Sequence, residues 1–340
     1  MGAISKKTSR INGVITIPGD KSISHRSLIL ASQCVGRTKI TGLLESEDVL
    51  HTAEALKNLG VPIKKTNKTW VVDGVGVGGL RDAKKKLYLG NSGTGVRLLM
   101  GLVSSYPFTS EFTGDESLSR RPMGRVIDPL KLTSAVFEAK NNMLPLKVTG
   151  NHNMIPIKYT VPVASAQVKS AILLAALNIP GRTTVIEKSA TRNHTELMMK
   201  YLGVDLKVKG NEISITGQPE LKARDIKVPS DPSSAAFFVI AALIVPGSKI
   251  TVKNVNINKL RVGLYQTLKE MGANIKYKNK RKEAGEDIAD IEVSYSKLKG
   301  VSIPAERAPS MIDEYPILAV AAAFAKGKTK MNGLEELRVK

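Results

Sequence analysis

Five short polar clusters along the chain each precede an apolar segment, which is rich in alanine in the last three copies. They begin at Asp20, Asn91, Ser165, Asp231 and Asp313. Asp, Asn and Ser are preferred at helix N-termini, where their side chains cap free N–H groups. Such an end also binds phosphate or carboxylate, because its N–H groups and the positive end of the helix dipole face outward. Several such ends brought together predict an anion-binding pocket.

The side chains beside these clusters suit the same chemistry. Lys21 and Arg26 follow the first cluster, Arg97 follows the second and Gln167 lies in the third. Capping alone accounts for most Ser and Asp residues at helix starts. The cationic and amide groups next to the caps favour a functional interpretation, in which the clusters bind small anionic molecules.

The clusters are the starts of a sequence repeat, spaced 71, 74, 66 and 82 residues apart. In most copies the apolar segment ends at a Gly and a β-branched segment follows. A second helix is predicted in several copies, each ending before a Gly, namely Gly60, Gly203 and Gly272. Each repeat therefore predicts strand–helix–strand–helix–strand with the last strand doubled, which is an α/β architecture.

A chain of 340 residues is long for one hydrophobic core, so we expect two domains. The first is predicted over residues 18–227, with three repeats, and the second combines residues 1–17 with residues 228–340. The N-termini of the motif helices are expected to face a shared interdomain cleft. Only 27 residues follow Asp313, so we expect a truncated chain whose second domain is incomplete and whose last apolar helix is partly uncovered.

Composition narrows the class of protein. The net charge of +21 favours anionic partners. Aromatic residues make up 4% and are not interleaved with the basic runs, so we expect a lysine-rich solvated surface and no nucleic-acid partner. No apolar run predicts a membrane span, and the polar start of the chain does not resemble a secretory signal.

With a single cysteine, Cys34, no intrachain disulfide can form, and we expect a cytoplasmic protein. His25 and His194 are too few and too far apart to indicate a metal site.

Longer motifs around the clusters resemble those of one known family. They cover residues 18–26, 89–97, 120–124, 164–170, 309–316 and 333–340. In this order, and over nearly the whole chain, they resemble the motifs of the EPSP synthases. Their sequences are most similar to those of the bacterial class II branch. The resemblance implies a two-domain enolpyruvyl transferase fold, an inside-out α/β barrel of repeated strand–helix units, with the last unit incomplete.

The resemblance also implies a reaction. The enolpyruvyl group of phosphoenolpyruvate passes to the 5-hydroxyl of 3-phosphoshikimate, giving 5-enolpyruvylshikimate 3-phosphate and phosphate, in the shikimate pathway to chorismate and the aromatic amino acids. Both substrates carry a phosphate and a carboxylate, which lysines and arginines at helix ends position and stabilise. No cofactor or metal is implied, and we expect a monomer.

Residue roles follow by matching motifs. Lys21, between the substrates, and Asp313, the base near the 5-hydroxyl, are implied to be catalytic. The residues implied to bind 3-phosphoshikimate are Lys21, Ser22, Arg26, Ser165, Ala166, Gln167, Arg192, Asp313 and Lys340. Those implied to bind phosphoenolpyruvate are Lys21, Gly93, Arg121 and Gln167. Gly93 is also implied to set the room for glyphosate, which competes with phosphoenolpyruvate.

Each assignment has a plainer alternative. Asp313 alone would be a helix N-cap, Lys21 a surface lysine, and Arg192 a surface arginine or an ion-pair partner at a helix start. The family continues beyond Lys340 into a glutamate and arginines that act on phosphoenolpyruvate. The chain as given is therefore expected to bind 3-phosphoshikimate with negligible turnover.

Other functions stay open. One is a catalytically incomplete fragment that only binds shikimate-type anions, and another is a basic nucleic-acid binder, which a salt-dependent gel shift would detect. A third is the UDP-N-acetylglucosamine enolpyruvyl transferase, which carries a reactive cysteine in the loop corresponding to residues 114–124. This chain has no cysteine there, and Cys34 is predicted to be a buried structural thiol.

Overall fold

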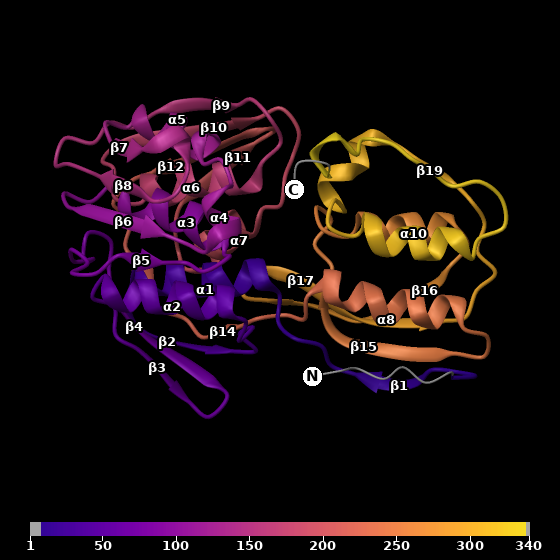
Figure 1. Ribbon diagram of the computed structural model, residues 1–340. Coiled ribbons are helices and arrows are strands. Elements are labelled where there is room, and N and C mark those ends of the chain that lie inside the picture. Colours follow the sequence, from indigo (N-terminus) through magenta and orange to yellow (C-terminus); the bar gives the residue numbers. More distant parts are fainter. Residues whose placement is uncertain (1–7, 338–340) are drawn as a thin grey trace. The chain divides into compact units, whose positions relative to one another are not determined.

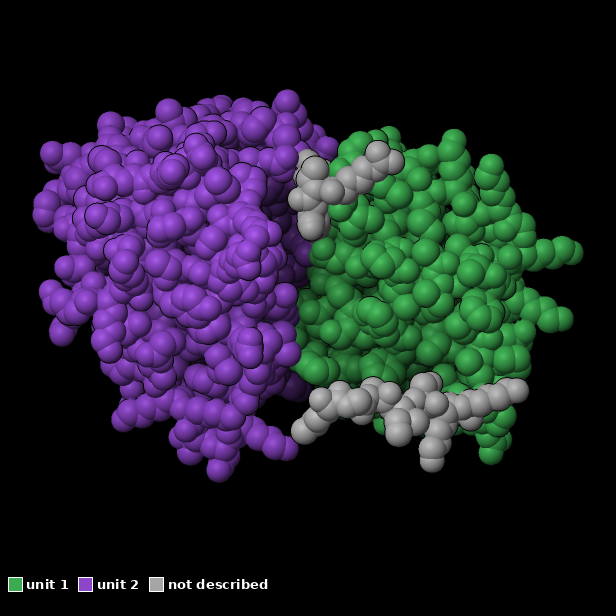
Figure 2. Space-filling view, in the orientation of Figure 1, with its two compact units in different colours: residues 1–20, 229–340 green, residues 21–228 purple. Residues whose placement is uncertain are grey.

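The computed structural model describes residues 8–337, which form two compact units (Figures 1 and 2). Unit 1 contains residues 1–20 and 229–340, and unit 2 contains residues 21–228. The chain therefore passes between the units twice, after Asp20 and after Val228. Within the described residues, no helix is long and apolar enough to span a bilayer.

The principal helices of unit 2 are buried on nearly all sides. They are α1 (Lys21–Ser32), α3 (Gly93–Val103) and α6 (Ala166–Ala176), and α3 packs against both of the others. Helices buried in this way form the interior of the unit, and the sheets lie outside them (Figure 1). The remaining helices are α2 (Glu47–Asn58), α4 (Glu116–Ser119), α5 (Gly124–Lys131), α7 (His194–Tyr201) and the 3₁₀ turn η1 (Lys140–Asn142).

Three sheets surround these helices. The first has the order β13 (Leu221–Lys222), β2 (Cys34–Thr41), β4 (Thr69–Val75) and β3 (Ile63–Thr66), and β14 (Ile226–Lys227) also pairs with β2. The second is β5 (Leu87–Tyr88), β6 (Thr109–Thr113), β8 (Leu146–Thr149) and β7 (Val136–Ala139). The third is β9 (Lys158–Val161), β10 (Arg182–Glu187), β12 (Glu212–Thr216) and β11 (Leu206–Lys209).

Unit 1 has one such sheet, in the order β1 (Asn12–Ile15), β15 (Lys249–Asn256), β17 (Glu286–Ser294) and β16 (Asn274–Glu283). All four sheets share one pattern, a parallel pair followed by two antiparallel pairings. This confirms the predicted repeat and its doubled last strand. Two strands pair outside their own repeat. β1 lies just before α1 in the chain but pairs with β15 of unit 1, and β14 lies just before α8 but pairs with β2 of unit 2.

The helices of unit 1 are α8 (Pro232–Ile244), α9 (Gly263–Glu270) and α10 (Tyr315–Ala323), with 3₁₀ turns η2 (Ala305–Ser310) and η3 (Glu335–Leu337) and the paired strands β18 (Ser302–Ile303) and β19 (Lys330–Met331). α8 packs on α10 and on the sheet. α10 is partly uncovered, since Val320 within it is 40% exposed and Phe324, just past its last residue, is 63% exposed.

Local sequence signals place most of these helices correctly. Gly60 and Gly203 lie just past α2 and α7 with φ of +89° and +96°, a conformation that favours glycine at helix C-termini. Asp231 caps α8 by accepting bonds from the N–H groups of Ser233 and Ser234. Asp313 is not the cap of α10, because the helix begins at Tyr315 and Glu314 is its N-cap residue.

Candidate active site

Lys21 is the first residue of α1. Its Nζ lies 3.2 Å from Asp48 Oδ2, and its side chain is 49% exposed. An ion pair this exposed contributes about 0–1 kcal/mol to stability. An anionic ligand therefore competes for the ammonium group at little cost to the fold. Ser22 follows in the same turn and is partly buried.

Arg26, one turn further along α1, is only 3% exposed. Its guanidinium donates to Ser22 O at 2.9 Å, to Thr195 Oγ1 at 2.7 Å and to Ser170 Oγ at 2.9 Å. Thr195 lies in α7 and Ser170 in α6, so the guanidinium joins three helices of unit 2. Arg26 thus orients the first turn of α1, which carries two residues implied to bind substrate.

His25 is fully buried beside these cations. Its Nδ1 lies 2.8 Å from Thr52 Oγ1. Burial, together with the charges of Arg26 and Lys21, lowers the pKa of His25 to about 3. The imidazole is therefore neutral at physiological pH and serves the packing of α1 on α2.

The N-termini of α3 and α6 are joined by side chains. Arg97 Nη1 donates to Gln167 Oε1 at 3.1 Å and to Gly93 O at 3.2 Å. Gln167 Nε2 donates in turn to Thr94 Oγ1 at 3.0 Å. The amide of Gln167 is thereby held in one orientation at two helix N-termini, where anion-binding groups are expected.

Arg121 approaches the same place from the loop after α4. Its Nη2 donates to Asn91 Oδ1 at 2.5 Å and to Ser117 Oγ at 3.3 Å. A Cβ on Gly93 would lie 3.1 Å from Arg121 Nη1 and 3.0 Å from Arg97 Nη1. Two guanidinium groups therefore lie against the backbone at Gly93, which has no side chain to displace them.

The electrostatics of this place favour a negatively charged ligand. Burial lowers the pKa of Arg97, and the like charges of Arg121 and Arg125 lower it further. A phosphate or carboxylate between these groups would relieve the repulsion. Arginine pairs with both anions through two parallel hydrogen bonds.

A buried charge cluster supports the loop that carries Arg192. Lys169 Nζ lies 2.8 Å from Glu187 Oε2, 2.7 Å from Glu196 Oε1 and 3.3 Å from Thr191 O. The Lys169 side chain is 1% exposed. The ammonium group holds both ends of the β10–α7 connection, and Arg192 lies partly buried within it.

Ser165 and Ala166 lie at the start of α6. Ser165 is the N-cap residue, and its Oγ accepts from Val168 N at 3.4 Å. The capping interpretation is thus correct for Ser165. A capping hydroxyl can still contact a ligand, because a hydroxyl oxygen also donates one hydrogen bond.

Asp313 belongs to unit 1, in the turn between η2 and α10, and its side chain is exposed. Its neighbour Glu314 is buried and accepts a hydrogen bond of 2.9 Å from Arg261 Nη1. An exposed carboxylate on a turn anchored from behind can accept a proton from a ligand hydroxyl.

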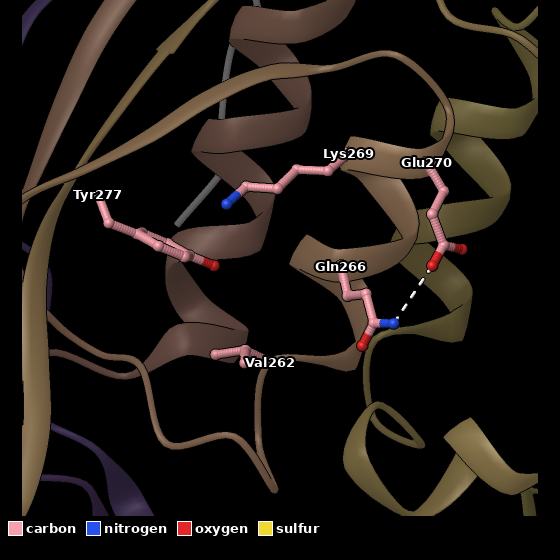
Figure 3. Close-up of a pocket in the computed structure, with 5 residues that line it drawn as sticks. All are labelled: Val262, Gln266, Lys269, Glu270 and Tyr277. Carbon is pink, nitrogen blue, oxygen red and sulfur yellow. Dashed lines mark hydrogen bonds between the residues drawn. The ribbon is translucent and has the colours of Figure 1, made fainter.

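Unit 1 also has an open pocket of about 430 Å³ along α9 (Figure 3). In the figure the Lys269 ammonium points to the ring of Tyr277, 4.0 Å from its centroid. Gln266 donates to Glu270 across 3.2 Å, and Val262 completes the lining. Of the residues implied to bind substrate, none that the structure describes lines this pocket.

Within unit 2 the structure brings Gly93, Arg121 and Gln167 together around Arg97. Arg97 had no assigned role, although its place in the second motif was a signal for one. Lys169 was also missed, because nothing in a sequence pattern indicates that a motif lysine is buried between two glutamates. Lys340 lies outside the described residues.

The reactive-cysteine alternative has no support in the structure. Cys34 is fully buried, and its thiol donates to Leu30 O at 3.3 Å. Burial raises its pKa to about 12. This confirms the prediction of a structural thiol, since a nucleophilic cysteine needs a lowered pKa and access to its substrate.

Comparison with known proteins decides the family. Residues 5–340 match the family described as "EPSP synthase (3-phosphoshikimate 1-carboxyvinyltransferase)". The chain belongs to the EPSP synthase family. A relative from Parvibaculum lavamentivorans, named 3-phosphoshikimate 1-carboxyvinyltransferase, is 57% identical over 96% of this chain and 74% of its own length. A relative of that name from Paramagnetospirillum magneticum is 56% identical over 99% of this chain and 77% of its own length.

Solved structures agree with this EPSP synthase assignment. EPSP synthase from Acinetobacter baumannii superposes with a TM-score of 0.89 at 45% identity, covering 97% of this chain and 75% of that one. The enolpyruvyl transferase NikO from Streptomyces tendae superposes with a TM-score of 0.71 at 17% identity, over 94% of this chain and 74% of its own. At that identity the second match shows the fold alone, and it is the predicted enolpyruvyl transferase fold.

Proposed function

We propose that this chain transfers the enolpyruvyl group of phosphoenolpyruvate to the 5-hydroxyl of 3-phosphoshikimate and releases phosphate. The reaction belongs to the shikimate pathway, which supplies chorismate for aromatic amino acids. Three relatives named for this activity are 54–57% identical over at least 96% of the chain. These comparisons favour neither UDP-N-acetylglucosamine as the acceptor nor binding of 3-phosphoshikimate with negligible turnover, which the motif analysis predicts for the chain as given.

One observation carries the assignment of the phosphoenolpyruvate site. Arg97 and Arg121 both reach the backbone at Gly93, and Arg97 is bonded to Gln167. Two fixed guanidinium groups beside a helix N-terminus suit a ligand with a phosphate and a carboxylate. We assign Gly93, Arg121 and Gln167 to this ligand, together with Lys21.

The 3-phosphoshikimate site is proposed from the neighbouring helix starts. Its residues are Lys21, Ser22, Arg26, Ser165, Ala166, Gln167, Arg192, Asp313 and Lys340. Support comes from the rigid placement of Arg26 and of the loop with Arg192, each held by buried hydrogen bonds. Groups fixed before the ligand arrives lose little entropy on binding.

The proposed chemistry has three proton transfers: one from the 5-hydroxyl, one to the methylene carbon and one from the methyl group of the adduct. Asp313 accepts the proton of the 5-hydroxyl while that oxygen adds to the enol carbon of phosphoenolpyruvate and the methylene carbon gains a proton. Loss of a proton from the resulting methyl group and departure of phosphate then regenerate the double bond. Lys21 and Arg121 stabilise the charge that develops on the phosphate.

Further parts of the proposal concern the protein as a whole. We place the folding domains at residues 18–227 and at residues 1–17 with 228–340, supported by the repeated sheets. A cytoplasmic monomer without a nucleic-acid partner is proposed from the composition and the single buried cysteine.

Incubation with both substrates tests the reaction, with phosphate release and product mass as readouts and UDP-N-acetylglucosamine as control acceptor. Phosphate released in equal amount with enolpyruvylshikimate phosphate establishes the proposed function. Binding of 3-phosphoshikimate without product would favour the alternative of a protein that only binds shikimate-type anions. Reaction with the control acceptor alone would contradict the assignment.

A further inference from the structure

A buried cluster in unit 1 surrounds the guanidinium of Arg261. Its Nη1 lies 2.9 Å from Glu314 Oε1, and its Nη2 lies 3.4 Å from Asp231 Oδ1 and 3.8 Å from Asp20 Oδ2. The Arg261 side chain is 3% exposed, and those of Asp20 and Glu314 are 0% and 2% exposed. One cation thus faces three carboxyl groups in the interior.

A hydroxyl group completes the cluster. Arg261 Nη2 donates to Ser233 Oγ at 2.7 Å, and this hydroxyl donates in turn to Glu314 Oε1. Ser233 stands in the first turn of α8, and Glu314 is the N-cap residue of α10. The cluster therefore fixes the starts of two helices relative to one another.

The same cluster reaches both segments where the chain passes between the units. Asp20 N donates to Pro229 O at 2.8 Å, and Asp231 N donates to Pro18 O at 3.0 Å. These bonds hold the two segments side by side within unit 1. Through the carboxylates of Asp20 and Asp231, Arg261 is attached to both.

The loop that carries Arg261 is itself rigid. Asn258 Nδ2 donates to the buried Glu286 Oε2 at 3.2 Å, and Asn258 Oδ1 accepts from Leu260 N at 2.9 Å. Arg261 N donates to Asn258 O at 2.8 Å. The backbone at Arg261 is thus held in place independently of the carboxyl groups that the guanidinium contacts.

A second contact from the same loop fixes the turn that carries Asp313. Gly263 begins α9, and a Cβ there would lie 2.2 Å from Ser310 Oγ and 3.1 Å from Met311 Cβ. The backbone at Gly263 therefore packs closely on residues just before Asp313. Arg261 holds Glu314, the residue just after Asp313, by a hydrogen bond.

A purely stabilising role explains the cluster poorly. Burying charged groups costs several kcal/mol per ion, and apolar replacements of equal volume are often as stable or more so. Buried ionic groups are better attested as devices that specify one arrangement. Asp313 and Lys21 are the two residues proposed as catalytic. The arrangement specified here joins Glu314, the neighbour of Asp313, to Asp20, the neighbour of Lys21.

We propose that Arg261 is a positioning residue for the transfer reaction. Through Glu314 and Ser233 it holds the turn that presents Asp313, and through Asp20 it ties that turn to the segment that leads into Lys21. The inference rests on the proposed function, in which Asp313 contacts the 5-hydroxyl of 3-phosphoshikimate.

A double-mutant cycle tests the inference on the full chain, with 3-phosphoshikimate affinity measured by calorimetry. Ser233→Ala removes the hydroxyl that bridges Arg261 and Glu314, and Asp313→Asn removes the negative charge from the proposed contact. We expect each variant alone to weaken binding by about tenfold, the size of one lost hydrogen bond to a charged group. The double variant should bind as weakly as Asp313→Asn alone, within about twofold, because the bridge acts only through Asp313.

Two further variants keep the test decisive. Ser234→Ala, in the same turn, is the matched control, because Ser234 contributes only its backbone N–H to the cluster. It should leave the affinity within about twofold of the wild type. Arg261→Lys keeps the positive charge but loses the planar guanidinium group. As a single substitution it should weaken binding of 3-phosphoshikimate, whereas in a chain that already carries Asp313→Asn it should have no further effect.

The outcomes separate the two claims. If the effects of Ser233→Ala and Asp313→Asn multiply, the cluster acts on the fold in general and the inference is wrong. If Asp313→Asn alone leaves the affinity unchanged, the charge of Asp313 makes no contribution to substrate binding. That result contradicts its proposed role and overturns the inference with it.

Discussion

Arg97 donates a hydrogen bond of 3.1 Å to the side-chain oxygen of Gln167, and this bond joins the first turns of α3 and α6. Gln167 is assigned to both substrates, whereas Gly93, in the same turn as Arg97, is assigned to phosphoenolpyruvate. The bond therefore connects the two substrate positions within unit 2. A change at either end is expected to affect both ligands.

Gln167→Ala tests this connection. The variant removes a ligand contact and releases the Arg97 guanidinium, so we expect affinity for 3-phosphoshikimate to fall by about tenfold or more. Thr94→Val is the control, since it removes only the 3.0 Å bond from Gln167 Nε2 to Thr94 Oγ1. Its affinity should stay within about threefold of the wild type, because Gln167 keeps its bond to Arg97. Calorimetric titration that finds equal losses for both variants would argue against a ligand contact by Gln167.

Gly93→Ala places a methyl group against two guanidinium groups. The new Cβ would lie 3.0 Å from Arg97 Nη1 and 3.1 Å from Arg121 Nη1, so both groups must shift by a few tenths of an ångström. We expect phosphoenolpyruvate and glyphosate to bind about tenfold more weakly, since bidentate pairing depends on geometry. Affinity for 3-phosphoshikimate should fall by less, because Arg97 acts on that ligand only through its bond to Gln167. A variant that binds glyphosate as well as the wild type does would refute the assignment of Gly93.

The buried His25 predicts a specific dependence of stability on pH. Its folded pKa of about 3 lies below the unfolded value of 6.5, so the unfolded chain binds a proton that the folded chain does not. Stability contributed by the neutral imidazole is therefore complete above about pH 6.5 and is lost as the pH falls toward 3, by about 1.4 kcal/mol per pH unit.

Urea unfolding of the wild type and of His25→Gln at several pH values measures this term. The difference in unfolding free energy between the two proteins should be constant above pH 7 and should shift in favour of the variant as the pH falls from 6 to 4. Parallel curves over that interval would mean that His25 is protonated in the fold or shifted far less than proposed.

Lys169→Met tests the support of the Arg192 loop. The variant leaves the carboxylates of Glu187 and Glu196 buried without a cation, which typically costs about 3–5 kcal/mol. Lys57→Met is the matched control, because Lys57 and Glu54 form an exposed pair in α2, and its loss costs about 0–1 kcal/mol. Denaturant unfolding that shows equal losses for both variants would contradict a structural role for the buried cluster.

Local rules made much of the fold predictable. The helix ends at Gly60 and Gly203 follow from the backbone conformation that glycine allows, and the repeat recurs because each sheet obeys one pairing pattern. Helix starts were less predictable. Asp313 lies two residues before the first residue of α10, and the N-cap residue is Glu314. The roles of Gly93, Arg121 and Gln167 follow from matching motifs and stay predictions.

The contacts that organise the site were beyond a single sequence. Arg97 and Gln167 are 70 residues apart, and Arg261 and Glu314 are 53 apart, so their pairing depends on how the helices pack. The exchange of β1 and β14 between the two sheets has no local signal either. Burial decides whether a lysine such as Lys169 is a surface charge or the centre of a cluster, and burial is set by the whole fold.

The central claim is that helix starts carrying cationic side chains bind a phosphorylated shikimate. The most direct measurement is calorimetric titration of the chain with 3-phosphoshikimate and, separately, with shikimate, which lacks only the phosphate. The account predicts that the phosphate raises the affinity by about 100-fold or more, the size of two charge-assisted hydrogen bonds. Equal affinity for the two compounds, or no binding of either, would contradict it.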